Sequence, residues 1–162
     1  MRLATRLAAT TLLLAATFTA GAVGCEATAN PPPLFRETAR QPAAPPPDSP
    51  RVLRARYVEV DFSALGGENL APASAPARLL LNLFPDVVLV AERNDVQPTA
   101  TGRGFIWTGH VEGAPASVVT LVAEDGVVAG RINAGGPLYT IGYAGDGVHI
   151  VRELNAEAFP PD

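Results

Sequence analysis

The chain has 162 residues, 48% of them hydrophobic, and its 12 basic residues, all arginine, are outnumbered by 16 acidic ones. The charges are scattered, without a basic stripe or interleaved aromatic and basic residues, so nucleic acid is not expected as a partner. Cys25 is the only cysteine. An internal disulfide is therefore excluded, and stability must come from a hydrophobic core or from a partner.

Residues 1–25 have the features of an export signal peptide. Two arginines give a positive start, and the apolar stretch over residues 7–20 is short for a membrane span. This stretch leads to Ala22-Val23-Gly24-Cys25, which has the small-residue form of a lipobox. We therefore predict that Cys25 is lipidated and that the chain is anchored to a membrane of the cell envelope. The alternative is ordinary secretion after cleavage near the same point.

Residues 26–50 form a proline-rich segment that holds half of the chain's 16 prolines. Such segments favour extended conformations and bury too little apolar surface to offset the entropy lost on ordering. We predict a disordered tether over 26–50, with a ligand for a proline-recognition domain as the alternative. The folded, β-rich domain is then predicted to span residues 51–162.

Hydrophobic residues from position 51 onward alternate with a period of two, which predicts β-strands. The register is clearest over residues 104–112, where Phe105, Trp107 and Val111 fall on one face. Trp107 is expected to be a core residue, because large aromatic side chains on an apolar face are usually buried.

The first predicted strand, near residues 53–62, is less regular. Leu53, Ala55 and Tyr57 are apolar and alternate with two arginines, whereas the apolar positions from Val58 onward fall in the opposite phase. We expect the apolar residues to face the core in both halves. A β-bulge between Tyr57 and Val58 would restore the register.

Six further strands are predicted over residues 79–84, 87–93, 117–123, 127–133, 138–143 and 148–154. Turn residues separate them, such as Asp125-Gly126 between two valine-rich runs, and residues 64–77 are expected to form a loop. About eight short, closely spaced strands predict an all-β fold. We expect a single antiparallel meander that forms a small sandwich or an open barrel.

A family resemblance is carried by residues 57–62, 81–87, 107–113 and 118–143 and by the close over residues 145–161. In their glycines, turns and apolar strands these segments resemble the N-terminal prodomain of secreted bacterial zinc metalloendopeptidases of the metzincin, reprolysin-like type. The resemblance covers essentially all of residues 51–162, and it implies a metalloprotease as partner. It carries over no catalytic residue.

Residues that could support chemistry are few. Neither His110 nor His149 is followed by glutamate, so the His-Glu-x-x-His motif of a zinc protease is absent from this sequence. A metal cluster would form if the two histidine strands were neighbours, but solvated surface histidines are the more frequent case. Asp125 and Asp146 lie in glycine turns without the ligand spacing of a calcium loop. We therefore predict no catalytic residue, cofactor or metal, and no enzyme.

These observations favour a non-catalytic, exported envelope lipoprotein whose β-domain binds a protein partner. A cognate metalloprotease is the expected partner, with the domain acting as inhibitor or folding aid. Strand addition at an open sheet edge is one route, and the tail over residues 155–162 could reach a protease cleft. Two alternatives remain: a structural or adhesive surface lipoprotein, and the remnant of a metalloprotease precursor.

Overall fold

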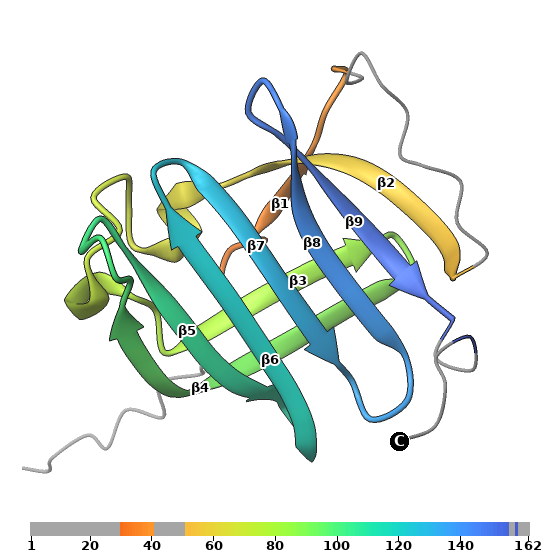
Figure 1. Ribbon diagram of the computed structural model, residues 1–162. Coiled ribbons are helices and arrows are strands. Elements are labelled where there is room, and N and C mark those ends of the chain that lie inside the picture. Colours follow the sequence, from red (N-terminus) through yellow and green to blue (C-terminus); the bar gives the residue numbers. More distant parts are fainter. Residues whose placement is uncertain (1–29, 41–50, 156–157, 159–162) are drawn as a thin grey trace, which may run out of the picture.

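Alternating strands joined by tight turns curl this chain into one antiparallel sheet that forms a nearly closed barrel (Figure 1). The computed structural model describes residues 30–40, 51–155 and 158. The nine strands found there are β1 (Phe35–Glu37), β2 (Val52–Val60), β3 (Arg78–Phe84), β4 (Val87–Pro98), β5 (Gly104–Val111), β6 (Ala114–Glu124), β7 (Val127–Asn133), β8 (Leu138–Gly145) and β9 (Val148–Leu154). Their order in the sheet is β1-β2-β9-β8-β7-β6-β5-β4-β3. The predicted all-β meander is confirmed, and of the two expected forms it takes the barrel.

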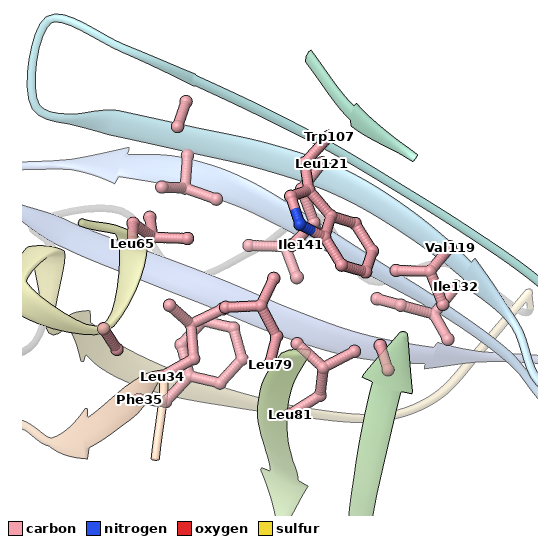
Figure 2. Close-up of a cluster of buried hydrophobic side chains, with 14 of the residues drawn as sticks. Leu34, Phe35, Leu65, Leu79, Leu81, Trp107, Val119, Leu121, Ile132 and Ile141 are labelled. Carbon is pink, nitrogen blue, oxygen red and sulfur yellow. The ribbon is translucent and has the colours of Figure 1, made fainter. Parts of the chain in front are cut away.

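Inward-facing side chains fill the barrel. Trp107 on β5 pairs in register with Leu121 on β6, and its side chain is fully buried. Figure 2 shows the indole lying against Leu121 and Ile141, with Ile132 nearby. The indole Nε1 donates a hydrogen bond of 2.9 Å to the carbonyl oxygen of Pro76. The prediction that Trp107 belongs to the core is confirmed.

Two of the hairpin turns have the backbone geometry that their sequences predict. Asp125 and Gly126 have φ values of 48° and 75°, and Asp146 and Gly147 have values of 52° and 76°. Two successive positive φ angles define a type I′ turn, whose twist matches that of the flanking strands. These turns join β6 to β7 and β8 to β9.

One end of the barrel is covered by residues 62–77, which include the short 3-10 helices η1 (Phe62–Leu65) and η2 (Pro72–Ser74). Leu65 and Leu70 from this loop are buried in the core cluster. We call this end of the barrel the capped end. Within the described residues, neither helix approaches the length or the apolar character that a membrane span requires.

The predicted disordered tether is wrong for residues 33–37, because β1 belongs to the barrel. Leu34 and Phe35 are 0% and 2% exposed, and Figure 2 shows them beside Leu79. The Leu34 N–H donates to the Leu80 carbonyl at 2.9 Å. Burial of these two apolar side chains offsets the conformational entropy lost on ordering. The average composition of residues 26–50 does not indicate this local burial. The predicted signal peptide and residues 26–29 and 41–50 of the predicted tether lie outside the described residues.

Candidate functional site

The sheet is incompletely closed beside β2. At the capped end, β1 pairs antiparallel with β2 from Phe35 opposite Val60 to Glu37 opposite Val58. The β1–β2 ladder ends at Glu37, and the next residue is held by its side chain, since Thr38 Oγ1 donates to a Glu59 carboxylate oxygen at 2.8 Å. In the described part of the chain, residues 52–57 of β2 pair with β9 on one side and with no strand on the other.

Three residues face this unpaired edge from the other side of the opening. Asn82 and Phe84 belong to β3, and Asp86 lies in the turn between β3 and β4. We call the edge over residues 52–57, together with these three residues, the seam. Hydrogen bonds and ion pairs from side chains, in place of backbone pairing, hold it together.

Arg54 and Arg56 point inward at the seam, which contradicts the predicted orientation of this strand. Leu53 is 61% exposed and Ala55 is also exposed, whereas the two arginines share the inner face with the buried Val58. The expectation that apolar residues face the core throughout β2 is therefore wrong for its first half.

The predicted bulge is also misplaced. Tyr57 and Val58 pair with Ile150 and His149 of β9 without interruption. The register shifts instead around Leu53, because Val52 pairs with Leu154 and Arg54 pairs with the preceding residue of β9. A bulge there strengthens the local twist at the beginning of β2.

Arg54 finds its partners across the seam. Its Nε lies 2.6 Å from an oxygen of Glu153, and its Nη1 lies 2.7 Å from an oxygen of Asp86. The guanidinium carbon sits 4.2 Å from the centre of the Phe84 ring, a cation–π distance. Two hydrogen bonds raise the pKa of Arg54, the larger effect coming from Asp86 and the smaller from Glu153. The bond between Arg54 and Asp86 also lowers the pKa of Asp86. These partners explain how an arginine is accommodated on the inner face.

Arg56 spans the opening nearer to β1. Its Nη2 donates to the backbone carbonyl of Asn82, while its Nε is buried and has no hydrogen-bond partner among the described residues. Burial lowers the pKa of Arg56, and the charge of Glu37 opposes this effect. The Asn82 side chain accepts from the Phe35 N–H at 2.9 Å and donates to the Phe35 carbonyl at 2.7 Å. Asn82 thereby pairs with β1 much as a backbone amide would.

The seam is suited to accept a strand. β1 demonstrates that this edge of β2 pairs with an antiparallel segment, and an added strand would continue its line over residues 52–57. The opening is filled by arginine side chains and is not a hollow. Three surface depressions of about 290–480 Å³ lie elsewhere, and none is lined by a seam residue.

The two histidines lie far apart in the sheet. His110 is on the outer face of β5, with Nδ1 2.8 Å from Asn94 Oδ1 and Nε2 3.4 Å from a Glu92 oxygen. His149 is inside β9 and fully buried, so its expected position on the surface is wrong. β5 and β9 are not neighbours, and no cluster of three or more potential metal ligands occurs within the described residues.

The arginine and asparagine side chains of the seam were not recognised as a site from the sequence. The available signal is the change of phase near Tyr57, which predicts a bulge from the sequence alone but in the structure marks two inward-facing arginines. Comparison with protein-family models, curated proteins and solved structures gives no match to this chain.

Proposed function

We propose that this chain is a non-catalytic, exported module that binds an extended segment of a protein partner at the seam. The observation that carries the proposal is the edge of β2 over residues 52–57, unpaired in the described part of the chain and in line with β1. The proposed partner is a metalloprotease, which the module would inhibit or help to fold. The resemblance to metzincin prodomains supports this choice.

The energetics of the seam favour strand entry. An added strand gains backbone hydrogen bonds, each with a net contribution of about 0.5–1.5 kcal/mol. Strand entry must open the hydrogen bond from Arg56 to the Asn82 carbonyl, and it must open the Arg54–Asp86 pair, whose side chains are 39% and 62% exposed. Solvent and salt screen such a pair, so its loss opposes binding only weakly.

The chain leaves the barrel next to the seam. The Asn155 N–H donates to the Arg51 carbonyl at 2.8 Å, immediately before the unpaired edge begins. The predicted partner-contacting tail, residues 155–162, therefore begins beside the seam. This proximity supports an inhibitory role in which the tail and the seam engage one protease together.

Lipidation of Cys25 remains a proposal, and it would place the barrel close to the membrane. Leu34, nine positions after Cys25, is already part of the core, so only eight residues lie between them. Such a segment reaches at most about 30 Å when fully extended. The proposed location is therefore the surface of the cell envelope.

The experiment that tests the proposal is site-specific crosslinking from two single-cysteine variants. In a Cys25→Ser background, Ala55→Cys places a photo-crosslinker at the seam, and Ala129→Cys places one on the outer face of β7, where the alanine is also exposed. After incubation with a solubilised native envelope, we expect a metalloprotease crosslinked at position 55 and absent at position 129. The purified chain should slow that protease in proportion to its own concentration.

Other outcomes would favour different functions. A metalloprotease crosslinked equally from both positions would contradict the seam as its site. Crosslinks only to non-protease envelope proteins would favour the structural or adhesive alternative.

A further inference from the structure

His149 is a buried titratable group that the proposed partner binding does not use. It lies on the inner face of β9, fully buried, opposite Val58 of β2 and Tyr143 of β8. Fully buried histidines are uncommon in small domains, because the imidazole must either satisfy its two nitrogens or remain neutral.

The hydrogen bonds of His149 determine which nitrogen carries the proton. The Val128 N–H donates to Nε2 at 3.0 Å, so Nε2 is an acceptor and the proton of the neutral ring is on Nδ1. Nδ1 is buried and has no hydrogen-bond partner among the described residues. The Tyr143 ring packs edge-on against the imidazole, with ring centres 5.3 Å apart.

The surroundings of His149 offer little compensation for a positive charge. β2 and β7 present Val58 and Val128, and β8 presents the ring of Tyr143. The Tyr143 hydroxyl accepts a hydrogen bond of 3.2 Å from the Gly147 N–H. Burial lowers the pKa of His149 below its ordinary value of 6.5, and a weaker electrostatic interaction with the backbone of Gly147 opposes this effect.

Two charged groups share the inner face with Val58: Arg56, two positions before it on β2, and Glu37, opposite it on β1, and the charge of Glu37 acts on Arg56. The other charged groups nearby engage one another. Glu59 follows Val58 on β2 and, by strand alternation, lies on the opposite face. Asp146 is exposed in the β8–β9 turn. Arg40 contacts both segments, with Nε 3.9 Å from a Glu59 oxygen and Nη1 donating to the Asp146 carbonyl at 3.3 Å.

We propose that His149 makes this barrel acid-labile: protonation of its buried imidazole removes the acceptor for Val128 and places an unpaired charge between β2, β7 and β8. In the protonated ring both nitrogens are donors, so Nε2–H would oppose the Val128 N–H directly. The barrel therefore loosens at the end where the β6–β7 and β8–β9 turns lie. This inference does not depend on the identity of the partner.

The direction of the pH effect follows from the lowered pKa. Between the folded pKa and the unfolded value of 6.5, the unfolded chain binds a proton that the folded chain does not. The contribution to stability is therefore complete above pH 6.5 and is lost as the pH falls below it. One proton of difference lowers the folding equilibrium constant by up to about tenfold for each pH unit.

Urea unfolding of the full chain at several pH values tests the inference, with the fluorescence of Trp107, the only tryptophan, as the signal. The test variant is His149→Gln, whose amide oxygen can accept from Val128 and does not titrate. Between about pH 6.5 and pH 5, the folding equilibrium constant of the wild type should fall up to about tenfold more per pH unit than that of this variant. The matched control, His110→Gln on the outer face, should keep the wild-type profile.

A second measurement covers the case in which His149→Gln does not fold. NMR titration of the wild-type imidazole signals should show that His149 remains neutral until the protein unfolds. Either of two results would overturn the inference: parallel pH profiles for wild type and His149→Gln, or a folded-state His149 that titrates at its ordinary pKa.

Discussion

The indole of Trp107 lies over Gly109, two positions further along the same face of β5. A Cβ atom at Gly109 would come within 2.1 Å of the Glu92 carbonyl oxygen and 2.6 Å of the Trp107 ring. The burial of Trp107 could be predicted, because strand alternation determines which face a residue occupies. The requirement for glycine at 109 could not, because it depends on the direction in which the indole turns.

We expect Gly109→Ala to destabilise the barrel by about 1–3 kcal/mol or more, as overpacking of a filled core does. Urea unfolding monitored by Trp107 fluorescence measures the effect. The control is Gly136→Ala in the β7–β8 turn, where a Cβ would meet nothing within 4 Å. Equal stability of the two variants would show that the space beside Trp107 is not filled as described.

The strands from β3 to β9 follow the sequence pattern closely, whereas β1 and the first half of β2 do not. Apolar alternation identifies a strand only where the barrel interior is apolar. In β2 the inward positions belong to Arg54 and Arg56, whose partners Asp86, Glu153 and the Asn82 carbonyl are distant in sequence. Local sequence patterns contain no information on such distant partners, so the seam could be identified only from the structure.

The contribution of β1 can be measured with two adjacent substitutions. Phe35→Ala should cost about 3–5 kcal/mol, because it removes a buried aromatic side chain and leaves a cavity. Arg36→Ala, the control, removes a side chain that is 63% exposed and should change stability little.

A chain that starts at residue 51 lacks β1 altogether, and we expect it to unfold at lower urea concentration than one that starts at residue 30. Equal midpoints would contradict the assignment of β1 to the core.

At the scale of the whole molecule, the fold class was predictable because turns and strand periodicity are local features. The partner and the location were not predictable in this way, and they remain proposals.

If Cys25 is lipidated, wild-type protein should enter the detergent phase of a phase-separating extraction, and Cys25→Ser should remain in the aqueous phase. Wild-type protein found in the aqueous phase would contradict the lipid anchor.

The prediction that the domain folds without metal is tested by chelation. We expect a strong chelator to leave the thermal midpoint of the purified chain unchanged. A metal that binds only the folded state would raise the midpoint, and its removal by the chelator would lower it. A midpoint that falls by several degrees and is restored by zinc or calcium would contradict this prediction.

The central claim is that the seam accepts a strand of a protein partner. Hydrogen exchange of the purified chain, with and without the captured metalloprotease, tests it most directly, because an amide that gains a strand partner exchanges more slowly. The account predicts new protection at residues 53–57 of β2, with little change on the outer face of β7. Protection confined to other strands, with unchanged exchange at residues 53–57, would contradict it.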